Sequence, residues 1–110
     1  MARKTIQLDL VVKTQVQEYR KQLKRAKIPI SNLFIFGSRA KGTAHWYSDI
    51  DVAVISPKFG KDYHRDLVKL MKLRTGATLD IEPHPMHPDD LNDRWSTLAQ
   101  EVKKYGIPVD

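Results

Sequence analysis

The sequence predicts an α/β or α+β domain in which helices cover a small mixed β-sheet. Three observations lead to this class. Short apolar runs bounded by glycine, proline or acidic residues indicate buried strands. Longer stretches with an apolar residue at every third or fourth position indicate amphipathic helices. Finally, 110 residues suffice to bury a core and suit one domain, which we expect to span residues 1–110.

Composition excludes several classes of protein. The chain has no cysteine, so neither a disulfide nor a thiolate metal site is predicted. No apolar stretch approaches the ~20 residues that span a bilayer, and the first residues lack the apolar segment of a signal peptide. We therefore expect a cytoplasmic protein without a membrane span. The net charge of +6 resides in residues 1–27, and the rest of the chain is balanced.

The first predicted element is an amphipathic helix that Pro29 is expected to close. Apolar residues recur along it at helical spacing, and the opposite face is strongly basic. That basic face is either a solvated helix surface or a docking surface for an acidic partner or RNA. The apolar positions are Val12, Val16, Tyr19, Leu23 and Ala26.

Two buried strands are predicted next, at residues 33–36 and 52–55. The second follows Asp49 and Asp51 directly. Because side chains alternate along a strand, we expect both carboxylates on one face, where they repel each other unless a cation lies between them. Mg²⁺ is the natural candidate, since it takes one or two carboxylates together with substrate phosphates.

The end of the first strand predicts the complementary phosphate half of this site. Gly37 permits a sharp turn and close ligand approach, and Ser38 is expected to start a short helix whose free N–H groups face an anion. Arg39 and Lys41 either screen the phosphate charge or are simply exposed. Taken singly, each motif also occurs in ordinary turns and loops. In the following loop, Trp46 and Tyr47 either stack on a nucleobase or cover the strand ends.

These residues resemble the signature of the DNA polymerase beta-like nucleotidyltransferase superfamily. The string from Gly37 to Gly42, followed by Ser48-Asp49-Ile50-Asp51, is similar to its minimal nucleotidyltransferase branch in particular. The resemblance runs from about the first helix to the end of the chain. It implies a nucleotidyltransferase that uses two Mg²⁺ ions held by the aspartate pair, with ATP as substrate. The nucleotide-binding residues that it implies are Gly37, Ser38, Arg39, Lys41 and Ser48.

A third strand is predicted over residues 77–82, with Asp80 and Glu82 on one face. Acids fit poorly inside a strand unless that face is wet or binds metal. The resembled family places its third catalytic carboxylate on such a strand, which would complete one metal site and take the proton of the acceptor hydroxyl. Pro83 is expected to end the strand, which favours Glu82 as catalytic residue and metal ligand, with Asp80 as the alternative.

Two further helices follow from apolar spacing. The first extends from Tyr63 to about residue 74, with Gly76 as its stop, and the second begins at Pro88 and ends at Gly106, with Trp95 in the core. A last extended segment is expected at 107–109. Between these helices, His84 and His87 are not predicted to bind metal, because no cysteine or third histidine lies nearby.

The resemblance also implies a partner. Minimal nucleotidyltransferases are commonly antitoxins paired with a helical toxin of the HEPN ribonuclease class, and some transfer AMP to a tyrosine of that toxin. The chain has only the nucleotide half of the larger enzymes, so the acceptor must be another protein or a second copy. We therefore predict a protein adenylyltransferase antitoxin in a hetero-oligomer with a HEPN-type toxin. The alternatives are a non-catalytic antitoxin, a homodimer, or a transferase acting on RNA or a small molecule.

Overall fold

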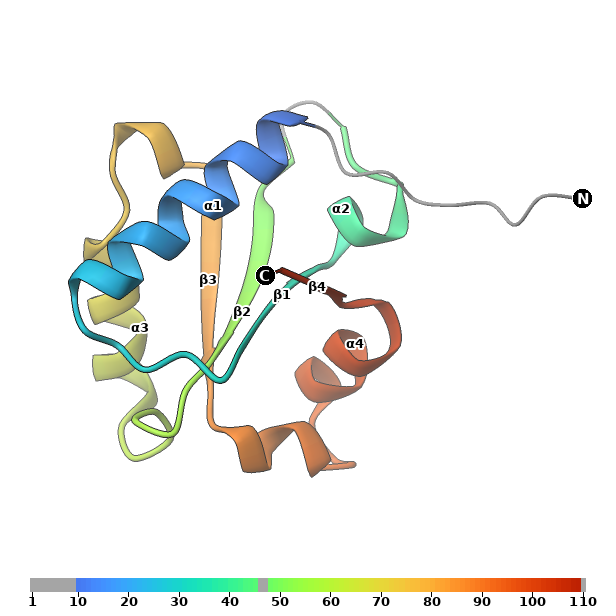
Figure 1. The fold of residues 1–110 in the computed structure, drawn as a ribbon. Coiled ribbons are helices and arrows are strands. Elements are labelled where there is room, and N and C mark those ends of the chain that lie inside the picture. The colour runs from blue at the N-terminus through green and yellow to red at the C-terminus, as the bar shows by residue number, and fades with distance from the viewer. Residues whose placement is uncertain (1–9, 46–47, 110) are drawn as a thin grey trace, which may run out of the picture.

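The computed structural model describes residues 10–45 and 48–109. Helices and strands alternate along them as the periodicity predicts (Figure 1). In chain order the elements are α1 (Leu10–Arg25), β1 (Asn32–Phe36), α2 (Ser38–Lys41), β2 (Ile50–Ile55), α3 (Tyr63–Lys72), the 3₁₀ turn η1 (Gly76–Thr78), β3 (Ile81–Met86), the 3₁₀ turn η2 (Pro88–Asn92), α4 (Thr97–Tyr105) and β4 (Ile107–Pro108).

Within the described residues, the strands form one mixed sheet in the order β3-β2-β1-β4. Strand β1, one of the two inner strands, runs antiparallel to both β2 and β4, whereas β2 and β3 are parallel. The predicted class, a small mixed sheet covered by helices, is confirmed. None of the helices in the described ranges combines the length and the apolar character that crossing a bilayer requires.

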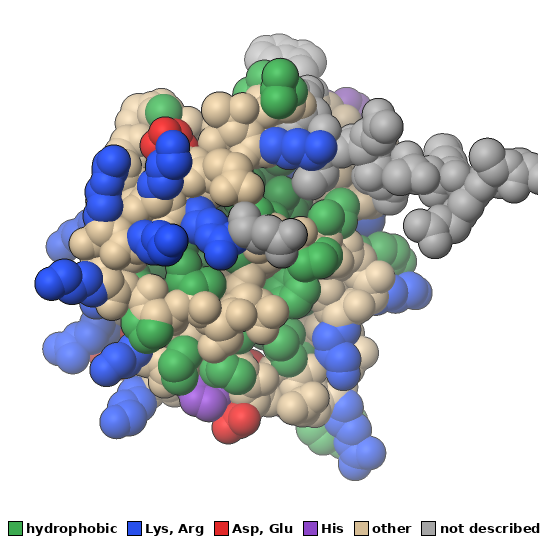
Figure 2. Space-filling model, in the orientation of Figure 1, with side chains coloured by type: hydrophobic (Ala, Val, Ile, Leu, Met, Phe, Trp, Pro, Cys, Tyr) green, Lys and Arg blue, Asp and Glu red, His purple; other side chains and the backbone are tan. Residues whose placement is uncertain are grey.

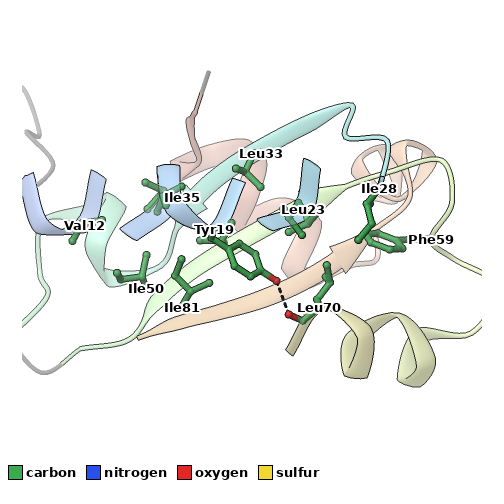
Figure 3. Packing of buried hydrophobic residues seen from close by; sticks show 13 residues of the cluster. Val12, Tyr19, Leu23, Ile28, Leu33, Ile35, Ile50, Phe59, Leu70 and Ile81 are labelled. Atoms are coloured by element: carbon green, nitrogen blue, oxygen red, sulfur yellow. Dashed lines mark hydrogen bonds between the residues drawn. The ribbon is translucent and has the colours of Figure 1, made fainter. Parts of the chain in front are cut away.

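One face of the sheet packs against α1 and α3, and α1 lies across it in Figure 1. The alternation of strand side chains sends Leu33, Ile35, Ile50, Val52 and Val54 into this core, where they meet the predicted stripe of α1 (Figure 3). Members of that stripe buried within α1 are Val12, Val16, Tyr19 and Leu23.

Tyr19 links the two helices on this face. Its hydroxyl donates a hydrogen bond of 2.8 Å to the carbonyl oxygen of Leu70 in α3 (Figure 3). Burial raises the pKa of the Tyr19 hydroxyl above its ordinary value. The tyrosine therefore stays neutral and serves as a hydrogen-bond donor inside the core.

The opposite face packs against α4 through a smaller apolar cluster. Strand residues of this face alternate with those of the first core and meet Ala99 and Val102 of α4. Their positions are Phe36, Ala53, Ile55 and Met86. This second face carries the polar residues described below.

Strand β3 corrects the prediction for residues 77–82. Residues 76–78 form a 3₁₀ turn, and the strand starts at Ile81 and continues through Pro83 and Pro85 to Met86. Proline is tolerated because β3 is an edge strand: the carbonyls of Asp80 and Met86 accept hydrogen bonds from β2 and its continuation, so the intervening prolines turn their nitrogens away from the ladder. The expectation that Pro83 ends the strand was wrong.

The predicted helix bounds also need correction. Pro88 begins only a short 3₁₀ turn, and α4 starts at Thr97, where Ser96 caps the backbone N–H of Ala99. Trp95 therefore lies outside the helix and is 83% exposed, so its expected place in the core was wrong. The terminal segment at 107–109 is confirmed in part, as Ile107–Pro108 forms β4.

Two other expected helix ends are earlier than predicted. Helix α1 ends at Arg25, before Pro29, and Lys27 adopts a positive φ of 59° in the turn that follows. Helix α3 ends at Lys72, before Gly76, which instead opens η1. Both helices therefore end in local turns, before Pro29 and Gly76, the residues that were expected to end them.

Candidate metal and nucleotide site

Two carboxylates and one imidazole meet where β2 and β3 run side by side. Asp51 and Glu82 are paired directly across the parallel ladder, and His84 lies two residues further along the same face of β3. One ligand atom from each of the three side chains lies within 4.8 Å of the others. The Nε2 atom of His84 is 3.1 Å from Oδ1 of Asp51.

Gly37, which directly follows the neighbouring strand β1, lies against the Asp51 carboxylate. Its backbone has φ 72° and ψ −152°, a conformation that is essentially restricted to glycine. A Cβ atom at this position would collide with Oδ2 of Asp51. The glycine thus makes the turn into α2 and leaves the room that the carboxylate occupies, and Ser38 begins α2 as predicted.

The remaining predicted acids lie outside this group. Asp49 is exposed and precedes Ile50, the first residue of β2. The alternation of side chains along a strand, which predicted that Asp49 and Asp51 share a face, therefore does not apply to Asp49. Asp80 lies before β3, and its Oδ2 accepts a hydrogen bond of 2.9 Å from Nε2 of Gln15 in α1. Among the described residues, the structure therefore groups Glu82, and not Asp80, with Asp51.

The predicted phosphate-binding residues take different positions. The Nη2 atom of Arg39 donates 2.8 Å to the carbonyl oxygen of Ser48, so Arg39 joins α2 to the segment that leads into β2. Lys41 forms an ion pair of 2.6 Å with Glu101 of α4, and this hydrogen-bonded contact raises the pKa of Lys41. Arg39 thus holds the loop that precedes Asp49, whereas Lys41 anchors α2 to α4. Trp46 and Tyr47 lie outside the described residues.

Electrostatics of the group favour a cation. In residues 10–45 and 48–109, neither Asp51 nor Glu82 has a lysine or arginine within ion-pair distance. Asp51 has a hydrogen bond from the neighbouring His84 instead, and the two carboxylates still repel each other where they meet; a divalent ion between them would remove that repulsion. Oxygen and imidazole donors that converge on one point therefore fit a divalent metal.

His84 is the residue that sequence reasoning missed. The signal was present as an acid and a histidine two positions apart, Glu82-Pro83-His84, but it identifies one face only if the strand continues past the proline. Because the expectation ends β3 at Pro83, it places the histidine outside the strand. The structure instead places its ring against Phe36 in a T-shaped contact, with ring centroids 4.9 Å apart.

Comparison with known proteins identifies the kind of domain. A family model described as a nucleotidyltransferase domain matches residues 8–110. No curated protein matches the chain. A solved structure assigned as a nucleotidyltransferase, from Sulfolobus solfataricus, is similar with a TM-score of 0.60 and 16% identity, over 89% of this chain and 75% of that one.

Two toxin–antitoxin structures are also similar. One, solved with AMP-PNP, has a TM-score of 0.54 and 26% identity, covering 87% of this chain and 70% of that one. The other is a mutant of the toxin–antitoxin MntA-HpeT, with a TM-score of 0.53 and 21% identity, covering 84% of this chain and 69% of that one.

Proposed function

This chain belongs to the family of nucleotidyltransferase domains, and we propose that it transfers AMP from ATP to a hydroxyl group, a tyrosine of a partner HEPN-type toxin. In this proposal residues 1–110 form one catalytic domain that acts as an antitoxin in the cytoplasm. The observation that carries it is the placement of Asp51 beside Glu82 and against Gly37, within a chain of this family. The similarity to toxin–antitoxin structures, one of them with AMP-PNP, supports the partner and the nucleotide.

The donor set fits the divalent ions that this chemistry requires. Asp51 and Glu82 converge on one point, and the missing Cβ of Gly37 leaves space for the Asp51 carboxylate. We assign Asp49 and Asp51 to two Mg²⁺ ions, with Glu82 completing one of the two sites. When bound, such ions activate the acceptor oxygen and stabilise the departing pyrophosphate.

The chain's own residues position the reactants and move one proton. The backbone around Gly37 and Ser38 holds the phosphate tail, with Arg39 near its charge and Ser48 in the segment that Arg39 secures. The acceptor oxygen forms a bond to the α-phosphorus, the bond to the β-phosphate oxygen breaks, and pyrophosphate leaves. Glu82 takes the proton of the acceptor hydroxyl. The protein contributes mainly position and charge, as in other phosphoryl transfers.

A labelling experiment tests this function. With ATP labelled at the α-phosphate, Mg²⁺ and the candidate toxin, we expect label on the toxin, and none when Asp49→Asn and Asp51→Asn are combined. The control Asp89→Asn removes an exposed carboxylate of η2 and should not reduce labelling. Undiminished transfer by the double variant would contradict the metal role of the pair. Label on RNA instead of protein would favour the RNA-modifying alternative, and neutralisation of the toxin without label would favour a non-catalytic antitoxin.

For the partner surface, we propose the basic face of α1. The apolar stripe of α1 is buried in the core, so its Lys and Arg side chains face outward, and Figure 2 shows basic side chains gathered on this side of the molecule. Arg20 is partly committed, because its Nη1 atom donates to the carbonyl oxygen of Val109. Lys24 in α1 and Lys27 in the turn that follows the helix are exposed, and we count Lys27 with this face. An acidic patch on the toxin would complement this surface.

Charge reversal distinguishes docking from a merely solvated face. The variant Lys24→Glu with Lys27→Glu should slow association with the toxin more than it speeds dissociation, since exposed charges act mainly on encounter. The effect should fade as salt rises, because such charges are screened over ~10 Å at 0.1 M. Lys24→Arg with Lys27→Arg keeps the charge and serves as the matched control. If the charge-reversal variant associates with the toxin at the wild-type rate in low salt, the basic face of α1 is a solvated surface and not a docking surface.

A further inference from the structure

His84 occupies a rigid position beside the two carboxylates. It lies in the edge strand β3 between Pro83 and Pro85, whose rings restrict the backbone on both sides. Its side chain is 20% exposed, and the ring packs against Phe36 of β1 in a T-shaped contact. Nε2 faces Oδ1 of Asp51 at 3.1 Å. The imidazole is therefore aimed at the carboxylate pair by the fold rather than by a mobile loop.

The separation of these atoms suits ligands of one ion. Nitrogen and oxygen donors lie about 2.0–2.2 Å from a small divalent ion, so two ligands of the same ion are separated by no more than about 4.4 Å. Nε2 of His84 and Oδ1 of Asp51 are hydrogen-bonded to each other at 3.1 Å, a distance that neighbouring ligands of one ion can also have. The ligand atoms of the whole group lie within 4.8 Å, close to that limit, and the Glu82 side chain is exposed and so has room to adjust.

The chemistry of the donors limits which ion they select. An all-oxygen site suits Mg²⁺, whereas an imidazole nitrogen adds a donor that first-row transition ions bind more strongly. Asp51 and Glu82 supply two negative charges, and in the described residues no lysine or arginine competes with an ion for them. A site of two carboxylates and one imidazole therefore differs in ion preference from one built on carboxylates alone.

We propose that His84 is a ligand of the divalent ion held by Asp51 and Glu82, and that this position prefers a first-row transition ion such as Mn²⁺, Co²⁺ or Zn²⁺ over Mg²⁺. The inference deepens the proposed function, on which it rests for the role of the ion, and it replaces Mg²⁺ by a transition ion at one of the two positions, the one held by Asp51 and Glu82. Nε2 supplies the lone pair to the ion, which leaves the ring proton on Nδ1.

Nitrogen NMR of the whole wild-type chain, without nucleotide, tests the ligand directly. Zn²⁺ is titrated into ¹⁵N-labelled protein, and the ring nitrogens of each histidine are followed. We expect Nε2 of His84 to shift as a metal-bound nitrogen, while the ring of His64, exposed on α3, does not respond. If the Asp51 and Glu82 backbone signals respond and the His84 ring does not, the ion is held by carboxylates alone and the inference is wrong.

Calorimetry with Co²⁺ and Mg²⁺ tests the preference. His84→Asn should weaken Co²⁺ binding by at least ~10-fold, since even outer-shell partners of a metal contribute 10–100-fold, and should change Mg²⁺ binding less. His64→Asn is the matched control, expected to leave both affinities unchanged. Equal loss for the two ions, or no loss, would overturn the preference. If His84 binds the ion but no label reaches a toxin, the inference stands and the proposed function fails, so the two outcomes are separable.

Discussion

The two faces of the sheet are built from the same strands but have opposite character. The face under α1 and α3 is closed and apolar, and it contains Tyr19, Leu23 and Leu70. The face toward α4 has a smaller apolar cluster, next to which Asp51, Glu82 and His84 remain accessible. The difference shows how period-two alternation lets one strand serve two purposes, because neighbouring residues of β2 point to opposite faces.

This division separates stability from chemistry. Carboxylates can remain near each other on the α4 face because that face is only partly covered, whereas burial among apolar groups would make their charge costly. The α1 face carries the larger buried apolar cluster and so holds the strands in register. Substitutions on the two faces should therefore change different measured quantities.

The largest effect is expected from the acid that faces Asp51. Glu82→Gln should lower the single-turnover rate of nucleotide transfer by ~10²–10⁴, the usual contribution of a general base. Asp80→Asn should slow transfer much less, because Asp80 is bonded to Gln15 outside the group. The free energy of unfolding should change little in the Glu82 variant. If Asp80→Asn slowed transfer more than Glu82→Gln, Asp80 would be the third catalytic carboxylate, and the assignment of the catalytic residues to the α4 face would be wrong.

Gly37→Ala should affect both stability and activity. The variant forces alanine into a glycine conformation, which costs ~1–3 kcal/mol, and its Cβ displaces the Asp51 carboxylate. Thermal unfolding and transfer rates measure the two effects. Gly76→Ala is the matched control: no atom within 4 Å would meet its Cβ, so both quantities should stay near wild type. A Gly37 variant with full activity would contradict the role of this close contact.

Substitution of one buried valine on each face compares the apolar packing of the two faces directly. Val16 lies in α1 and Val102 in α4, and both are almost fully buried. Val16→Ala should lower the free energy of unfolding by about 2 kcal/mol, from two lost methyl groups and the cavity left behind. Val102→Ala should cost less, because the smaller cluster around α4 can close more of that cavity. Chemical denaturation gives both values, and equal losses would contradict the asymmetry.

The smallest effect concerns the Tyr19 hydroxyl. Tyr19→Phe leaves the Leu70 carbonyl without its donor and should cost about 1 kcal/mol at neutral pH. Because burial raises the folded-state pKa of Tyr19, the unfolded chain loses this proton first above its pKa of ~10, and stability falls as pH rises through that range. The phenylalanine variant should lose less stability on alkaline titration. Tyr63→Phe, at an exposed position, is the control and should follow wild type.

Several elements were determined by the sequence alone. The spacing of Val12, Val16, Tyr19 and Leu23 predicted the buried face of α1, and the apolar runs predicted β1 and β2. The turn at Gly37 and Ser38 was predicted because it depends on a local backbone requirement. Such features involve residues close in the chain, whose periodicity and turn chemistry act regardless of distant contacts.

Other features were decided only by tertiary structure. The parallel pairing of Asp51 with Glu82 joins residues from separate elements, and its register comes from the packing of helices over both strands. The position of β3 at the edge of the sheet allowed it to pass through Pro83 and Pro85, which placed His84 beside Asp51. Trp95 fits the helical spacing yet is exposed, because the chain does not enter α4 until Thr97. Local patterns specify which faces are apolar, whereas only the packed sheet determines which polar residues meet.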